Sequence, residues 1–302
     1  MKINAVPRSA RIAAGFLAVI AVSTALAGCS SSDSTPSSSA SAGTVALPSA
    51  FKGKTLVAPA INGYPPYAYT ENGKNIGISS DLATAVGGPL GTTVTLKPDS
   101  FENALLGVNR GTYFGAFGAD VTADREKVYD QVSFLADHYE FMSLKATKLG
   151  TSMSSLCGLT ISLVAADSSI PVLQAESTTC TDAGKKAITI QTFADQGAAT
   201  LAVSSKQADA TTSTLTNLSY ISQQAPDTFQ LGGPKYQYVL IGIATKKGNG
   251  MAKALAASIN ELIDNGKYTS MLKKYGLEDD AITKAEVQPG PEHHQVKELT
   301  HV

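Results

Sequence analysis

Short apolar runs alternate with amphipathic segments along the chain from about residue 54 to residue 121. Apolar runs bounded by Gly, Pro or Asn are typical of strands, and apolar residues that recur three and four positions apart are typical of helices. An Asn-Gly pair at 72–73, between two extended segments, predicts a hairpin turn. The pattern predicts strands at 54–60, 94–96 and 113–121, a helix at 101–108, and a helix that ends at residue 86 and is capped by Ser80 or Asp81.

The same alternation starts again near residue 159. It predicts strands at 159–165, 188–190, 209–213 and 238–245, and helices at 170–176, 195–204 and 251–265. Alternating strands and helices predict an α/β architecture with a largely parallel sheet. Two similar halves with short connections indicate two lobes, and ligands favour the cleft between such units.

The N-terminal segment has the order of a secretory signal. Three basic residues precede an uncharged run at 12–27, and the sequence Leu-Ala-Gly-Cys then ends at Cys29. The run is shorter than the ~20 apolar residues that span a bilayer. We therefore expect residues 1–28 to be the signal peptide of an exported protein and Cys29 to carry a lipid anchor. A plain secretory signal followed by an unrelated cysteine is the alternative.

The segments at both ends differ in composition from the middle. Residues 29–46 are mostly Ser, Thr, Ala, Gly and Pro, which cannot bury enough apolar surface to order themselves, so they predict a flexible tether. Residues 289–302 show no periodicity and predict a flexible tail, in which His293 and His294 are exposed rather than metal-binding. About 240 residues lie between, enough for one large or two small domains.

Charge and cysteine content narrow the class further. After the signal segment the chain has 21 basic and 25 acidic residues. This slight excess of negative charge does not favour nucleic-acid binding. With Cys29 lipidated, Cys157 and Cys180 remain as an even pair, and in an oxidising compartment such a pair predicts a disulfide. A zinc site is the alternative, but neither cysteine has a His or second Cys near it in the sequence.

Seven short motifs follow one another along most of the chain. They are Tyr-Pro-Pro-Tyr at 64–67, Asn-Gly-Lys-Asn-Ile-Gly-Ile-Ser-Ser-Asp-Leu-Ala at 72–83, Val-Thr-Ala-Asp-Arg at 121–125, Leu-Cys-Gly-Leu-Thr at 156–160, Gln-Ala-Asp-Ala at 207–210, Ile-Gly-Ile-Ala-Thr-Lys-Lys-Gly at 241–248 and Ile-Asp-Asn-Gly-Lys-Tyr at 263–268. In this order the chain resembles the extracellular solute-binding proteins, family 3, of polar amino-acid ABC transporters.

The resemblance implies an α/β fold of the two-lobed, type II periplasmic-binding-protein kind, with a ligand cleft between lobes joined by two hinge strands. It places the crossovers near 139–146 and 234–240. Lobe 1 is then expected to comprise residues 47–142 and 238–288, and lobe 2 residues 143–237.

The resemblance also implies which residues hold the ligand. Arg125 matches the arginine that binds the ligand carboxylate, and a planar guanidinium suits that task. An ordinary arginine on a helix surface is the alternative. Tyr64, Tyr67 and Phe101 match the aromatic walls of the cleft, and for Tyr67 packing in the core is an equal possibility.

Three further segments match less closely. Gly118, Ala119 and Asp120 lie where the family offers backbone groups and a hydroxyl to the ligand, and Asp120 replaces that hydroxyl. Ser168 or Ser169, before a predicted helix, is expected to bind the carboxylate at the helix N-terminus. Thr214 lies where the family usually has the aspartate that binds the ligand ammonium. Either Asp120 has taken over this role or the ligand is not a standard α-amino acid.

These observations predict the substrate-binding component of an ABC importer. We expect a monomer that binds a small polar solute, is lipid-anchored outside the cell membrane, and delivers the solute to a permease without catalysis. We identify no catalytic residue, cofactor or metal site, since His138 is the only histidine inside the domain and general acid–base catalysis needs a positioned group in the cleft. The alternatives are a dehydratase-like cleft enzyme and a sensor domain for a membrane receptor.

Overall fold

The structure is a computed structural model that describes residues 44–289. The predicted signal peptide, Cys29, and most of the predicted tether and tail lie outside the described residues. The described residues form one compact unit, so the residue boundaries of the two lobes stay a prediction. No helix in the described part of the chain is both long enough and apolar enough to cross a membrane.

The first lobe contains the N-terminal strands and helices and the last two helices. Its elements are β1 (Leu56–Ile61), β2 (Tyr69–Glu71), β3 (Lys74–Ile76), α1 (Ile78–Ala85), β4 (Val94–Asp99), α2 (Phe101–Arg110), β5 (Ala116–Asp120), α3 (Ala123–Val128), α7 (Met251–Asp264) and α8 (Lys267–Tyr275). Strands β1 and β4 pair in parallel, and β2 and β3 form the hairpin that the Asn-Gly pair predicts. Two helices missing from the predicted set, α3 and α8, belong to this lobe.

The second lobe contains three strands and three helices. They are β7 (Thr160–Val164), α4 (Ile170–Asp182), β8 (Thr189–Phe193), α5 (Gln196–Ser204), β9 (Ala210–Thr214) and α6 (Leu215–Gln224). Strand β7 pairs in parallel with β8 and with β9. Helix α4 extends beyond its predicted end at 176, and α6 was not predicted.

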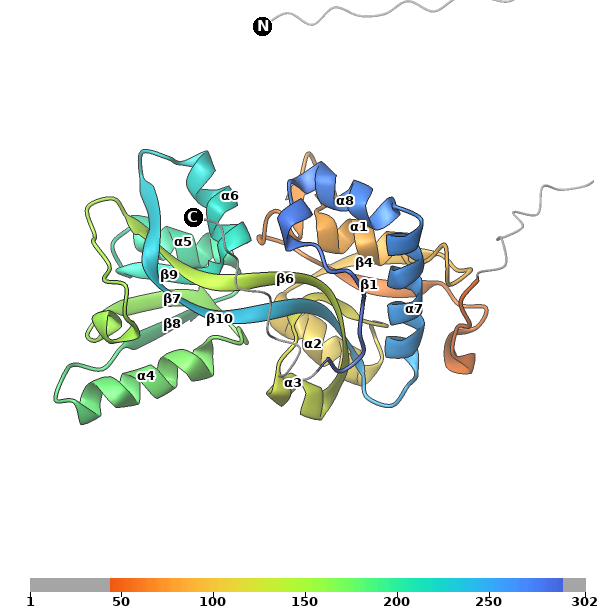
Figure 1. Cartoon of the computed structure of the whole chain (residues 1–302), viewed down its shortest axis with the longest axis horizontal. Helices are drawn as coiled ribbons and strands as arrows, with labels where there is room; N and C mark the ends of the chain where they lie inside the picture. Colours follow the sequence, from red (N-terminus) through yellow and green to blue (C-terminus); the bar gives the residue numbers. More distant parts are fainter. Residues whose placement is uncertain (1–43, 290–302) are drawn as a thin grey trace, which may run out of the picture. The chain divides into compact units, whose positions relative to one another are not determined.

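Two long strands, β6 (Tyr129–Leu144) and β10 (Phe229–Lys246), connect the lobes. They run antiparallel to each other from the group of β7, β8 and β9 to the group around α2 and α3 (Figure 1). The main sheet has the order β5-β10-β6-β9-β7-β8. Its β5–β10, β10–β6 and β6–β9 pairs are antiparallel, so the expectation of a largely parallel sheet is wrong. The parallel strands β7, β8 and β9 are present, but the hinge strands β6 and β10 belong to the same sheet and pair in antiparallel fashion.

The hinge strands are irregular where they pass between the lobes. The pairing of β10 with β6 shifts register between Gly232 and Tyr236 and again between Tyr236 and Tyr238. Gln237 lies in this stretch with φ 49°, a left-handed conformation that is uncommon for a residue with a side chain. Such bulges bend a strand locally, which suits a connection that must flex.

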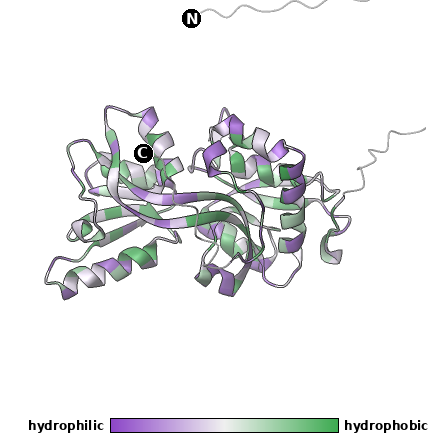
Figure 2. Cartoon of the chain, viewed as in Figure 1, coloured by the Kyte–Doolittle hydropathy of each residue, from purple (hydrophilic) through white to green (hydrophobic). Residues whose placement is uncertain are grey.

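The core is built from the apolar faces that the periodicity predicts. Figure 2 shows hydrophobic and hydrophilic residues alternating along α7, whose Leu255, Ile259 and Leu262 are buried. In the second lobe Val203 and Leu218 are fully buried with Met142 of β6. Each such side chain contributes about 1.5–3 kcal/mol when it leaves water.

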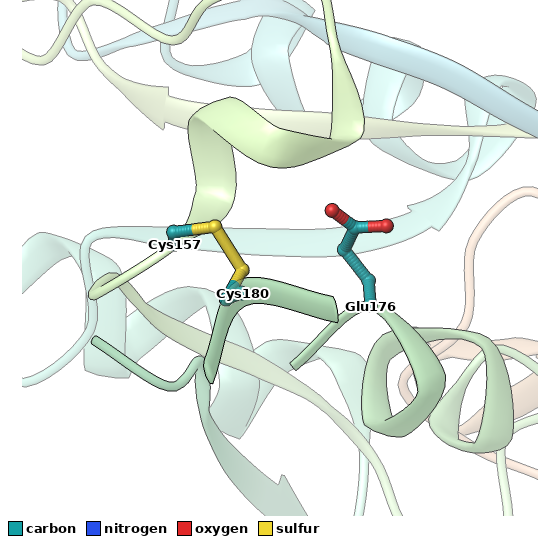
Figure 3. Close-up of side chains that lie close together, drawn as sticks. All are labelled: Cys157, Glu176 and Cys180. Carbon is teal, nitrogen blue, oxygen red and sulfur yellow. A yellow bond between two sulfur atoms is a disulfide. The ribbon is translucent and has the colours of Figure 1, made fainter. Parts of the chain in front are cut away.

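Cys157 and Cys180 are joined by a disulfide, as the even pair of cysteines predicts (Figure 3). The bond ties the turn after the 3-10 helix Met153–Leu156 to α4. Glu176 lies beside the two sulfur atoms, and these three residues form the only cluster in the described residues with the spacing of a metal site. Because both sulfurs are bonded to each other, neither is a thiolate that could bind a metal.

Candidate ligand-binding site

A small cavity lies between the two lobes. Its volume is about 40 Å³, enough for only a few water molecules. A ligand of amino-acid size therefore enters only when the lobes move apart. The cavity is lined by Ile61, Asn62, Tyr64, Tyr67, Ala68, Ser79, Phe101, Phe117, Gly118, Asp120 and Arg125 of the first lobe, Tyr139 of β6, and Val164, Asp167, Ala194, Asp195 and Gln196 of the second lobe.

Arg125 contributes the only positive charge of this lining. Helix α3 begins after Thr122, whose hydroxyl accepts the backbone N–H of Arg125 and so fixes the first turn. The Arg125 side chain is 11% exposed, and its guanidinium carbon lies 5.3 Å from the centre of the Phe101 ring. One guanidinium N–H group donates to the backbone oxygen of Asp120 at 3.0 Å, and another donates across the cleft to that of Ala166 at 2.8 Å.

Asp120 and Asp167 face each other from opposite lobes. The hydroxyl of Tyr139 lies between them, 2.8 Å from Oδ2 of Asp120 and 3.2 Å from Oδ2 of Asp167. Asp120 also accepts a hydrogen bond from Ser168 Oγ, and its Oδ2 is 3.7 Å from the guanidinium of Arg125. Burial and then the charge of Asp120 raise the pKa of Asp167 to about 6. The two carboxylates thus share one region of low dielectric.

The turn at residues 166–169 places Asp167 in the cleft. Ala166 has φ 64°, and Asp167 Oδ1 accepts the backbone N–H of Ser169 at 2.8 Å and its hydroxyl at 2.5 Å. A carboxylate that accepts the N–H two residues ahead stabilises such a turn. Ser169 is therefore bonded to Asp167 and is fully buried.

The aromatic residues form one wall of the cavity. Tyr64 and Tyr67 stack with ring centres 5.2 Å apart. The Tyr67 hydroxyl donates to Oδ2 of Asp137 at 2.6 Å, and the Tyr64 hydroxyl lies 3.2 Å from Oγ1 of Thr214. Thr214 is thus held by Tyr64, behind the cavity wall, and offers no carboxylate there.

Two buried polar atoms of the lining have no hydrogen-bond partner in the described structure. They are Oγ of Ser79, a residue 3% exposed, and Oε1 of Gln196, a residue 1% exposed. The Gln196 amide nitrogen donates to Oγ1 of Thr211 at 2.9 Å, so its oxygen is the group left over. Leaving a buried polar atom unpaired costs about 1–3 kcal/mol, and such atoms point to a missing partner.

The predicted residues divide into two groups. Six of them line the cavity, namely Tyr64, Tyr67, Phe101, Gly118, Asp120 and Arg125. Four do not: Ala119 packs into the core beside α2, and Ser168, Ser169 and Thr214 bond to Asp120, Asp167 and Tyr64. Their roles in binding stay predictions in both groups.

Five polar residues of the lining, and Tyr139, were not predicted as site residues. The five are Asn62, Ser79, Asp167, Asp195 and Gln196. The sequence did point to Asp167, because it lies in the same 166–169 segment as Ser168 and Ser169, which were predicted to bind the ligand. The sequence also pointed to Asp195, because an aspartate at the start of the helix predicted at 195–204 is a typical helix cap. Its Oδ1 accepts the backbone N–H of Ala198 at 2.8 Å.

A second, larger cavity of about 580 Å³ is lined by other residues, some of them from the hinge strands. Its acidic lining residues are Asp137, Asp279 and Asp280, and it also contains His138, whose Nε2 is 3.5 Å from Oε1 of Glu140. His138 does not line the smaller cavity. The smaller cavity is the candidate ligand site, because of these two cavities it alone combines a buried guanidinium with the aromatic wall.

The family model of bacterial extracellular solute-binding proteins, family 3, matches residues 57–278. The arginine-binding protein ArgT of Corynebacterium glutamicum is 24% identical over 239 residues, which cover 78% of this chain and 79% of that protein. Two solved structures share the fold. An ancestral arginine-binding protein bound to arginine has 23% identity, a TM-score of 0.66, and coverage of 73% of this chain and 97% of its own.

The other structure is the arginine-, lysine-, histidine-binding protein ArtJ of Geobacillus stearothermophilus. It has 18% identity, a TM-score of 0.66, and coverage of 74% of this chain and 95% of its own. Both likenesses concern the arrangement of the two lobes and the hinge strands.

Proposed function

Since the chain belongs to family 3 of the bacterial extracellular solute-binding proteins, we propose that it is the substrate-binding component of an ABC importer for an amino acid. The observation that carries the proposal is the guanidinium of Arg125 in the wall of an interlobe cavity, above Phe101 and beside Tyr64. A guanidinium binds a carboxylate through two parallel hydrogen bonds, and aromatic faces pack against the rest of a small ligand. The arginine-binding relative from C. glutamicum supports an amino acid as the ligand.

Capture follows from the contacts between the lobes. In the open protein Arg125 loses its bond to Ala166 of the second lobe, and a ligand carboxylate takes that place. Closure then restores the bonds that join the lobes elsewhere, such as Asn217 Nδ2 to the Pro65 oxygen at 2.5 Å. Ligand binding in this way favours the closed conformation, which the permease distinguishes from the open one.

Export and anchoring complete the proposal. The segment that ends at Cys29 supports a lipid anchor outside the cell membrane, with residues 29–46 as the predicted tether. We propose a monomer that carries out no catalysis. His138, the only histidine among the described residues, lies outside the lining of the cavity.

A thermal-shift panel tests the function. The chain from Ser30 to Val302 would be heated with amino acids, amines, sugars and carboxylates, each in excess. A ligand at a hundredfold excess over its Kd stabilises the folded state by about 2.7 kcal/mol. We expect stabilisation by α-amino acids. Stabilisation by sugars alone, or by nothing in the panel, would refute the proposal.

A further inference from the structure

The charged groups that line the cavity do not balance. Asp120, Asp167 and Asp195 contribute three carboxylates, and Arg125 contributes the one cation of the lining. The N–H groups of Arg125 donate to backbone oxygens, and its contact with Asp120 is a longer one of 3.7 Å. A zwitterion with one ammonium and one carboxylate would leave this excess of negative charge unchanged. Like charges in a buried site are costly without opposite charges to balance them, so the lining favours a ligand with a surplus of positive charge.

Asp120 and Asp167 share one hydrogen-bond donor across the cleft. They meet at the Tyr139 hydroxyl, which has one proton and can donate it to only one of them. Two carboxylates in one buried region repel each other, and a cation between them relieves that repulsion. Asp120 comes from β5 of the first lobe and Asp167 from the turn after β7 of the second, so a bound cation would also hold the lobes together.

Gln196 gives an independent indication that a donor belongs here. Its amide nitrogen is committed to Thr211, and its buried oxygen Oε1 has no partner in the described residues. An amide oxygen accepts N–H groups, and ammonium or guanidinium groups supply them. Gln196 lines the same cavity as Asp120 and Asp167.

We propose that Asp120, Asp167 and Oε1 of Gln196 form the acceptor for the ligand's cationic groups, and that the ligand is an amino acid with a positively charged side chain. This inference rests on the proposed function. Thr214 lies where an aspartate was expected to bind the ligand ammonium, but it has no carboxylate and its hydroxyl is bonded to Tyr64. Asp167, an aspartate of the second lobe, takes this role instead.

Calorimetry with charged and uncharged ligands of the same shape tests the inference. The chain from Ser30 to Val302 would be titrated with L-arginine and with L-citrulline, whose side chain has a similar shape and no charge, and likewise with L-lysine and L-norleucine. The wild-type protein should bind at least one cationic member roughly 10- to 100-fold more tightly than its neutral counterpart. Equal affinities, or binding of neutral amino acids only, would overturn the inference and leave the proposed function intact. If no amino acid binds, the proposed function itself fails.

Asp167→Asn tests the residue assignment. The variant keeps Oδ1, which accepts the Ser169 N–H and hydroxyl, so the turn should fold. Its affinity for the cationic ligand should fall roughly 10- to 100-fold, while the neutral counterpart changes little. Equal losses for both ligands would show a structural role and overturn the assignment. Asp182→Asn, the same change at an exposed position at the end of α4, is the matched control.

Proton release gives a readout that a structural role would not produce. A cation beside Asp167 lowers the pKa of its carboxyl from about 6, so near pH 6 binding releases protons. The heat of binding then depends on the ionisation enthalpy of the buffer, and Asp167→Asn abolishes this dependence. No dependence in the wild-type protein would count against the assignment. The charged and titratable groups that face Asp167 are Asp120, Arg125, Tyr64, Tyr139 and Tyr236.

Discussion

At the scale of single residues, Arg125 illustrates why arginine and lysine are not equivalent in a binding site. Its guanidinium spans the cleft by donating to backbone oxygens of both lobes, at Asp120 and at Ala166. A lysine ammonium has the same charge but no planar fork that could pair with both oxygens of a carboxylate. The position therefore depends on the geometry of the group as well as on its charge.

Arg125→Lys should weaken amino-acid binding roughly 10- to 100-fold, because the charge remains and the paired hydrogen bonds are lost. Isothermal titration calorimetry with the tightest amino acid would measure the change. Arg110→Lys is the matched control, since Arg110 is exposed in the last turn of α2, outside the cavity. Unchanged affinity in Arg125→Lys would show that the ligand carboxylate binds elsewhere.

Asp280 provides a pH dependence away from the ligand. Burial and then the charge of Asp137 raise the pKa of Asp280 to about 7. Because an unfolded aspartate has a pKa of about 3.9, the folded state alone holds this proton between about pH 4 and pH 7. The free energy of unfolding should therefore fall as pH rises through this window. Asp137, whose pKa burial also raises, acts in the same direction.

Urea unfolding at several pH values between 5 and 8 checks this prediction. Asp280→Asn should flatten the profile, because an amide does not titrate and still accepts from the Thr216 hydroxyl. Asp264→Asn, at the exposed end of α7, should leave the slope unchanged. A wild-type slope in the variant Asp280→Asn would place the titration in another group, and Asp137 is the neighbour whose pKa is also raised.

At the scale of elements, the disulfide acts on the second lobe alone. Cys157 and Cys180 are 23 residues apart and join the turn before β7 to α4. Neither lines the cavity. The double variant Cys157→Ser/Cys180→Ser should lose about 3 kcal/mol of stability, because the unfolded chain regains the freedom of that loop. Urea unfolding measures the loss, and ligand affinity at low temperature should be unchanged. A fall in affinity would mean that the bond also positions the cleft.

The elements differ in how well the sequence predicts them. Helix α7 has a regular apolar face, so its bounds at 251–264 lie within one residue of the prediction. Helix α6 is rich in Ser, Thr and Asn, which have weak helix propensity, so its contacts with β6, β9 and β10 are what stabilises it. Strand β6 has Gln131, Ser133 and Asp137 on buried faces, which hides the alternation that would have marked it as a strand.

The same limit applies to the candidate site. Arg125 and Tyr64 follow from short motifs in the sequence, and both line the cavity. Gln196 and Ser79 belong to helices whose residues look like ordinary surface or core positions until the lobes are placed together. Gln196 and Ser79 belong to the candidate site because the two lobes lie close together. That arrangement depends on the hinge strands and leaves no local pattern in the sequence.

At the scale of the whole molecule, closure depends on how closely the lobes approach. Gly63, in the loop after β1, lies so near the second lobe that a Cβ atom there would be 2.9 Å from Cβ of Asp195. Gly63→Ala should therefore hold the lobes apart and weaken ligand binding by roughly tenfold or more. Titration calorimetry measures the affinity.

The matched control for Gly63→Ala is Gly53→Ala. Gly53 has φ 70°, close to the 80° of Gly63, but nothing lies within 4 Å of its added Cβ. Both variants should lose about 1 kcal/mol of stability from the strained backbone. Only Gly63→Ala should lose affinity. Equal affinities in the two variants would mean that this contact does not limit closure.

Opening of the lobes should control the rate of ligand entry. The cavity of about 40 Å³ is far smaller than the roughly 300 Å³ at which ligand pockets begin, so binding requires a conformational step. The chain has 11 tyrosines and no tryptophan, and Tyr64 and Tyr67 stack in the cavity wall, so tyrosine fluorescence reports on the site. In stopped-flow mixing at low temperature, the observed rate should level off as ligand concentration rises. A rate that increases linearly throughout would describe single-step binding to a cleft that is already open, and Gly63→Ala should shift the profile toward that limit.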